Sequence, residues 1–122
     1  MQNKNLSEYI SEFKSFINTN DYLACIDLLL QAIKDFPHEE KLKLNLGNIY
    51  KLLDRKDEAI DVYTSLLETP FSSIAYNNLS LIMLELGNNQ KCIEYAREAL
   101  KSNREYNDAK YNLAVGLFEN KE

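Results

Sequence analysis

Apolar residues recur along this chain with the spacing of one face of an amphipathic helix. The clearest recurrence is a small residue followed by isoleucine, found at Cys25-Ile26, Ala59-Ile60 and Cys92-Ile93. A second apolar pair follows seven residues after each small residue, at Ala32-Ile33, Leu66-Leu67 and Ala99-Leu100. Apolar groups at i, i+1, i+7 and i+8 lie on one side of a helix. The pattern therefore predicts three matching helices, repeated at intervals of 34 and 33 residues.

A second helical segment precedes each of these helices, and a polar turn joins the two. In the preceding segments, equivalent apolar positions are held by Leu46, Leu79 and Leu113, and four residues later by Tyr50, Met83 and Leu117. The polar turns lie at 18–21, 54–57 and 87–90. The predicted unit is a helix, a tight turn, a second helix and a short linker. The predicted helices span about 6–18, 21–36, 39–53, 56–68, 73–86, 89–102 and, without a following partner, 107–119.

The second unit carries the residues that relate this repeat to a known family. These residues are Leu46, Gly47, Tyr50, Ala59, Tyr63 and Pro70. Their order resembles the 34-residue pattern of the tetratricopeptide repeat family, which is W-x2-L-G-x2-Y, then A-x3-F, then P. The resemblance covers residues 6–118, with departures such as Phe13 in a small-residue slot and Arg104 in place of proline.

The resemblance implies an all-α fold, a right-handed solenoid of three helix-turn-helix hairpins plus a C-terminal capping helix, seven helices in all. It implies one domain over residues 1–122, with repeats at about 6–39, 40–72 and 73–106 and the capping helix at about 107–119. Small residues are then expected where helices approach closely, at Cys25, Gly47, Ala59, Ser80, Cys92 and Ala114. Because the two cysteines fall two repeats apart, we expect them to be unpaired core residues.

Composition and charge narrow the class of protein. Three glycines and two prolines make about 4% of the chain, against roughly 12% in average usage, which argues against a β-sandwich, a barrel or a disordered chain. Fourteen Lys plus Arg against nineteen Asp plus Glu give a net charge of −5, which repels a phosphate backbone. Nucleic acid is therefore not an expected partner.

Targeting and catalytic signals are not found in the sequence. No secretory signal follows Met1, and apolar runs such as 81–84 are far shorter than a membrane helix, so a soluble cytoplasmic protein with no membrane contact is expected. The single histidine, His38, stands in a linker without a neighbouring catalytic group. No phosphate-binding glycine loop, nucleophile motif or metal-ligand spacing occurs. We therefore expect no enzymatic activity, no cofactor and no metal site.

The polar residues of interest are three asparagines in the first helices of successive units. Asn45, Asn78 and Asn112 occupy the same slot, and Ser11 stands there in the first unit. Asn is a mediocre helix former, and its amide both donates and accepts, so it can pair with an extended peptide backbone. The series resembles the asparagine ladder of peptide-holding members of the family, whose first helices line a concave groove. The alternative is compositional drift in an Asn-rich chain.

Residues on the same helical faces complete the predicted groove. They are Ile10, Lys14, Lys41, Leu44, Asn48, Ile74, Asn77, Leu81, Tyr111 and Val115. Some family members hold chaperone C-termini with a set of Lys, Asn and Arg side chains, and this chain does not match that set. Lys14 stands where Asn is needed, and the first helix of the third repeat offers Ile74 and Asn78 where Lys and Arg are needed. The leading hypothesis is therefore a binding module for an extended partner peptide.

The last predicted helix suggests a different role. It is apolar nearly all round, whereas a terminal cap is expected to have a polar face. Either Val115 and Phe118 belong to the groove, or Val115, Leu117 and Phe118 pack against another copy of the chain. The second hypothesis is thus a self-associating scaffold, a homo-oligomer built through this helix.

Overall fold

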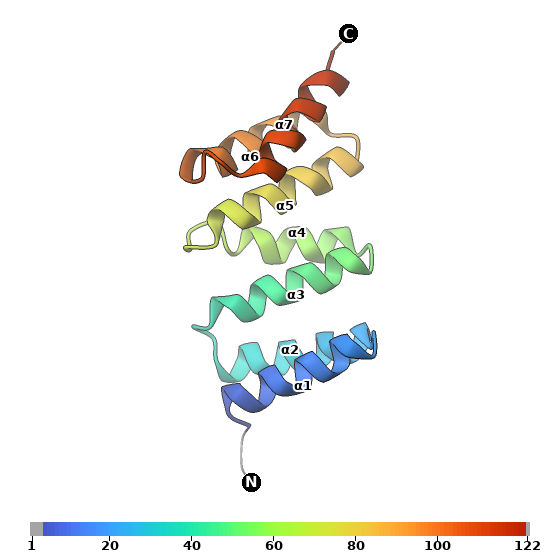
Figure 1. Cartoon of the computed structure of the whole chain (residues 1–122). Helices are drawn as coiled ribbons and strands as arrows, with labels where there is room; N and C mark the ends of the chain where they lie inside the picture. Colours follow the sequence, from blue (N-terminus) through green and yellow to red (C-terminus); the bar gives the residue numbers. More distant parts are fainter. Residues whose placement is uncertain (1–3, 122) are drawn as a thin grey trace. The chain divides into compact units, whose positions relative to one another are not determined.

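The computed structural model of the chain describes residues 4–121, and among these it forms α-helices and no strands (Figure 1). The helices are α1 Leu6–Asn18, α2 Tyr22–Asp35, α3 Glu40–Leu52, α4 Lys56–Thr64, α5 Ser72–Glu85, α6 Asn89–Ser102 and α7 Asn107–Glu119. Only α4 differs notably from its predicted span, because it ends at Thr64 instead of near residue 68. The chain then continues in short turns, in which the Leu66 amide bonds to the Tyr63 carbonyl and the Thr69 amide to the Leu66 carbonyl.

The same turn joins α1 to α2, α3 to α4 and α5 to α6. Each turn contains one residue with a left-handed backbone, namely Asn20, Asp54 or Gly87, with φ of 57°, 59° and 81°. The amide that follows each of them bonds back to a carbonyl of the preceding helix, as in Asp21 to Phe16, Arg55 to Tyr50 and Asn88 to Met83. Gly, Asn and Asp are the residues that tolerate this conformation best. The turn residues therefore recur with the repeat, as the apolar pattern does.

The residues up to Val62 form the first of two compact units. In this unit α2 packs against both α1 and α3. Cys25, Leu29 and Ile49 are buried in its core. The start of α1 is capped by Asn5, whose side chain accepts from the Glu8 amide while the Glu8 carboxylate accepts from the Asn5 amide.

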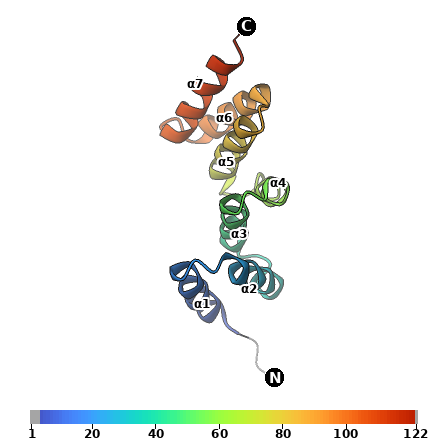
Figure 2. The same ribbon diagram turned by 90° about the vertical axis from the view of Figure 1, so that its right-hand side faces the viewer.

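The residues from Tyr63 onward form the second compact unit. Here α6 packs against α5 and α7, and α5 also packs against α7, as both views show (Figure 2). The Ser80 hydroxyl of α5 donates to the Cys92 carbonyl of α6 at 2.8 Å. On the other side of α6, a Cβ at Gly116 would lie 3.1 Å from the Cys92 sulfur and from Ile93 Cγ1. Small residues thus allow α6 to lie close to both neighbours.

The small residues are buried at five of the six predicted positions. Cys25, Gly47, Ala59, Ser80 and Cys92 are all buried, and neither cysteine forms a disulfide. Ala114 is exposed, which differs from the prediction. In α7 the buried stripe is Ala109, Asn112 and Gly116. Ala114 lies outside this stripe, and no described helix follows α7 to cover it.

Candidate functional site

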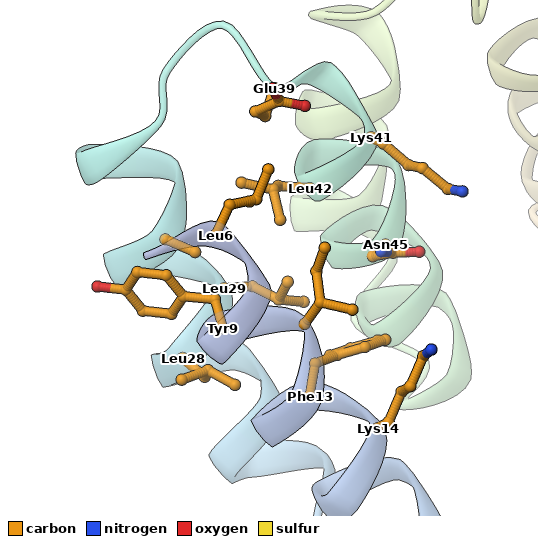
Figure 3. Close-up of a pocket in the computed structure, with 12 residues that line it drawn as sticks. Leu6, Tyr9, Phe13, Lys14, Leu28, Leu29, Glu39, Lys41, Leu42 and Asn45 are labelled. Carbon is orange, nitrogen blue, oxygen red and sulfur yellow. The ribbon is translucent and has the colours of Figure 1, made fainter. Parts of the chain in front are cut away.

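A pocket of about 280 Å³ lies between α1, α2 and α3 in the first unit (Figure 3). We call it the α1–α3 pocket. Most of its lining is apolar, and this part consists of Leu6, Tyr9, Ile10, Phe13, Leu28, Leu29, Ala32 and Leu42. Leu28, Leu29, Ala32 and Leu42 are themselves buried, so they form the interior of the pocket. Tyr9 is held in place by a hydrogen bond from its hydroxyl to Asp35, and this bond raises the pKa of Tyr9 to about 12.

Polar residues line one side of the α1–α3 pocket. Lys41 and Asn45 of α3 and Lys14 of α1 lie along the same side, opposite Tyr9 and Leu28, and we call these three residues the basic edge (Figure 3). Glu39, just before α3, is the remaining charged residue of the lining. Both lysines are exposed, and the described residues provide neither of them with an ion pair. The basic edge is therefore a site of positive potential on a chain whose net charge is −5.

The three asparagines of the predicted ladder have different surroundings. Asn45 is half-buried at the basic edge, and within residues 4–121 its side chain makes no hydrogen bond. Asn78 is buried and donates to the Ile74 carbonyl of its own helix at 3.1 Å. Asn112 is buried and donates to the Asn77 side chain of α5 at 3.0 Å. Asn45 is thus the member of the series whose side chain makes no hydrogen bond to the described residues.

The repeat matches the model of a known protein family. A family model described as tetratricopeptide repeat matches residues 40–69 and 74–106, which are the second and third predicted repeats and make up more than half of the chain. The chain belongs to the tetratricopeptide repeat family. The predicted family and the predicted all-α helical-repeat fold are therefore confirmed. Tetratricopeptide repeats generally serve as protein–protein interaction modules.

Solved structures support the same fold. A crystal structure of MamA protein superimposes with a TM-score of 0.79 at 21% sequence identity, over 90% of this chain and 61% of that chain. A second crystal structure of MamA gives a TM-score of 0.77 at 20% identity, over 94% of this chain and 64% of that chain. The present chain therefore spans less than two thirds of the MamA chains. Comparison with curated proteins yields no match.

The other predicted groove residues of this tetratricopeptide repeat chain are spread over both units. In the first unit, Ile10 lines the α1–α3 pocket, Leu44 is buried in the core and Asn48 is half-buried. In the second unit, Leu81 and Val115 are half-buried. Three large apolar side chains are exposed on α7, namely Tyr111, Leu117 and Phe118, at 68%, 46% and 69%.

Two features of the site were not predicted from the sequence. The interior of the α1–α3 pocket includes Leu28, Leu29 and Ala32 from α2, a second helix of a repeat, which the groove prediction assigned to packing alone. The second feature is the bond between Asn77 and Asn112. The signal for it was present, because Asn77 is the one polar residue at its slot, where the other repeats have Ile10, Leu44 and Tyr111.

Asn77 and Asn112 form a buried polar pair in the second unit. Asn77 accepts the hydrogen bond from Asn112 and lies near the half-buried side chain of Tyr106, which precedes α7. Burial raises the pKa of Tyr106, and the contact with Asn77 acts in the opposite direction. The bond between Asn77 and Asn112 thus joins α5 to α7 through two uncharged amides.

The described residues hold no group of three or more His, Cys, Asp or Glu side chains that could bind a metal ion. His38 is exposed in the linker between α2 and α3. Within residues 4–121, no helix is both long and apolar enough to cross a membrane.

Proposed function

We propose that this tetratricopeptide repeat chain is a non-catalytic interaction module that binds an extended segment of a partner protein. The observation that carries the proposal is Asn45, whose amide lies at the edge of the apolar α1–α3 pocket and makes no hydrogen bond to any described residue. A side-chain amide offers two donors and one acceptor, which suit the N–H and C=O groups of an extended main chain of any sequence. Lys14 and Lys41 lie beside it and extend the contact surface.

In the second unit the proposal assigns the same main-chain contact to Asn78 and Asn112. Asn78 donates to the Ile74 carbonyl and Asn112 donates to Asn77. An amide nitrogen carries two hydrogens, so the bond to Asn77 does not exhaust the side chain of Asn112. The residues proposed to border these contacts are Asn77, Leu81, Tyr111 and Val115, and Leu44 and Asn48 stand in the corresponding place in the first unit.

A protein ligand fits the charge of the chain better than a nucleic acid does. The net charge of −5 disfavours contact with a phosphate backbone, which binds through clustered Lys and Arg. The proposal includes no cofactor and no metal, and it assigns no reaction to His38, for which residues 4–121 provide no hydrogen-bond partner to orient it for proton transfer.

The test selects peptide ligands for the purified chain from a displayed library of random 12-residue sequences. Affinities of the selected peptides are then measured by fluorescence anisotropy for the wild type, Asn45→Ala and the control Asn107→Ala, which changes an exposed asparagine of α7. We expect Asn45→Ala to weaken binding about 10-fold without lowering the melting temperature, because it removes ligand hydrogen bonds worth about 1 to 1.5 kcal/mol. The proposal fails if no peptide is selected or if Asn45→Ala binds as tightly as the control.

A second function is supported by a separate observation. The exposed apolar residues of α7, Tyr111, Leu117 and Phe118, form a surface of the kind that marks an interface. In this alternative the chain is a self-associating scaffold, and Val115, Leu117 and Phe118 pack against another copy.

Sedimentation velocity over a wide concentration range separates the two functions. Self-association predicts a sedimentation coefficient that rises with concentration and falls back to the monomer value in Phe118→Glu. A single monomeric species at every concentration excludes the scaffold and leaves the peptide-binding module.

A further inference from the structure

The two units differ at one equivalent pair of positions. In the second unit, Asn112 of α7 donates to Asn77 of α5, and this bond ties two successive first helices together. Two repeats earlier in the chain, the same positions are Asn45 of α3 and Ile10 of α1, both in the first unit. Ile10 has no polar atom in its side chain, so it cannot accept a hydrogen from Asn45. The first unit therefore lacks the bond that links the first helices in the second.

The two units also differ in how closely these first helices approach each other. In the second unit α5 and α7 are in direct contact, whereas in the first unit α1 and α3 approach each other much less and both pack on α2. The α1–α3 pocket occupies the space between them, and both Ile10 and Asn45 line it. Ile10 is 41% exposed at the pocket, so part of its apolar side chain is open to a ligand. The pocket is thus an apolar surface without an internal partner.

The dimensions of the pocket suit a single large side chain. Its volume is about 280 Å³, and an engineered apolar protein cavity of about 150 Å³ binds benzene. A Phe, Leu or Ile side chain therefore fits with room for part of its backbone. The interior contributes only apolar groups, from residues such as Leu28, Leu29 and Leu42. A polar side chain placed there would lose its hydrogen bonds to water.

The charges beside the pocket specify what should flank that side chain. Lys14 and Lys41 lie at the basic edge on either side of Asn45 (Figure 3). Within the described part of the chain neither lysine has an acidic partner, and Glu39 is the single acid in the pocket lining. The local charge is therefore positive, and a carboxylate next to the inserted side chain is attracted to it.

Resting on the proposed function, we infer that the α1–α3 pocket receives a bulky apolar side chain of the partner segment, with an acidic residue immediately beside it in the partner sequence. Asn45 holds the main chain at that point, the pocket buries the apolar group, and Lys14 or Lys41 pairs with the carboxylate. The ligand class is a peptide in which Phe, Leu or Ile is adjacent to Asp or Glu.

A second copy of this chain is a poorer occupant on the grounds of charge. Its most exposed aromatic side chain is Phe118 of α7, and the Lys121 ammonium lies 5.9 Å from the centre of that ring. Insertion of Phe118 would bring this cation toward Lys14 and Lys41. An acidic peptide avoids that repulsion, so the partner is a different protein segment.

In the experiment, peptides are selected from the random 12-residue library on the wild type and on a charge-reversed variant that carries both Lys14→Glu and Lys41→Glu. The sequence preferences of the two sets of peptides are then compared. Both lysines are exposed, so the reversal is expected to leave the melting temperature nearly unchanged. On the wild type we expect enrichment of Phe, Leu or Ile next to Asp or Glu. On the charge-reversed variant we expect the apolar preference to remain and the acidic one to become basic.

A second variant tests the pocket itself. Ile10→Asn places a hydrogen-bond acceptor opposite Asn45, in the way that Asn77 lies opposite Asn112. The new bond should draw α1 toward α3, and it should also occupy the Asn45 amide that is proposed to bind the ligand. We expect this variant to bind the selected peptides at least 10-fold more weakly, with an unchanged melting temperature. The control Ile10→Leu should bind them as tightly as the wild type does. Replacing the apolar residue of the peptide by Ala should also lower the binding affinity at least 10-fold, because the burial of a Leu or Phe side chain is lost.

The outcomes separate this inference from the function on which it rests. If peptides bind through Asn45 but show no apolar preference, or if the charge-reversed variant selects the same acidic motif, the inference is wrong and the proposed function stands. If no peptide is selected, both are wrong. If sedimentation shows an oligomer that Ile10→Asn dissociates, the pocket holds a second copy and the assignment of an acidic peptide is overturned.

Discussion

The bond between Asn77 and Asn112 makes a quantitative prediction about the second unit. The two side chains are 7% and 5% exposed, and the bond length is 3.0 Å. In Asn112→Ala the amide of Asn77 stays buried and loses a partner, which costs about 1 to 3 kcal/mol. Alanine is a better helix former by about 0.5 kcal/mol, which offsets part of the loss. We therefore expect a net destabilisation of about 1 to 2 kcal/mol.

The reciprocal replacement, Asn77→Ala, leaves the buried Asn112 amide without its acceptor. We expect about 1 to 3 kcal/mol of destabilisation for Asn77→Ala. Changing both asparagines to leucine removes donor and acceptor together, and the double variant should be no less stable than either single variant. Leucine is the natural residue at this position in α3, where Leu44 is buried.

Urea unfolding followed by far-UV circular dichroism gives the free energies, and Asn107→Ala serves as the surface control. A change in midpoint with an unchanged dependence on urea reports stability, and a changed dependence would show that the two units unfold separately. The control should lie within about 0.5 kcal/mol of the wild type. If Asn112→Ala and Asn77→Ala are as stable as the control, the pair does not hold α5 and α7 together and the reasoning is refuted.

Two further predictions concern Tyr9 and Gly116. The hydrogen bond to Asp35 raises the pKa of Tyr9 to about 12, so the stability that Tyr9 contributes is complete below its ordinary pKa near 10 and is lost as the pH rises toward 12. The difference in unfolding free energy between wild type and Tyr9→Phe should therefore shrink with rising pH, and a constant difference would contradict it. Gly116→Val should destabilise the chain by about 1 to 3 kcal/mol, because even a Cβ at this position lies 3.1 Å from the Cys92 sulfur and from Ile93 Cγ1. An unchanged urea midpoint would show that α6 and α7 can separate at no cost.

Much of the fold follows from local patterns in the sequence. The apolar stripe repeats every 33 or 34 residues, and Asn20, Asp54 and Gly87 recur at the same interval because each turn needs a residue that adopts a left-handed backbone. Helix order, the turn positions and the family could be predicted from these signals. The end of α4 could not, because the apolar residues after Thr64 continue the helical pattern while the backbone leaves it.

The candidate site depends on relations between helices that no local pattern contains. Asn45, Asn78 and Asn112 are equivalent in sequence, yet Asn112 bonds to Asn77 on another helix, Asn78 bonds within its own helix, and Asn45 faces a pocket. What each amide can do is set by the residue that packing brings opposite to it. Opposite Asn112 that residue can accept a hydrogen bond, and Ile10, opposite Asn45, cannot.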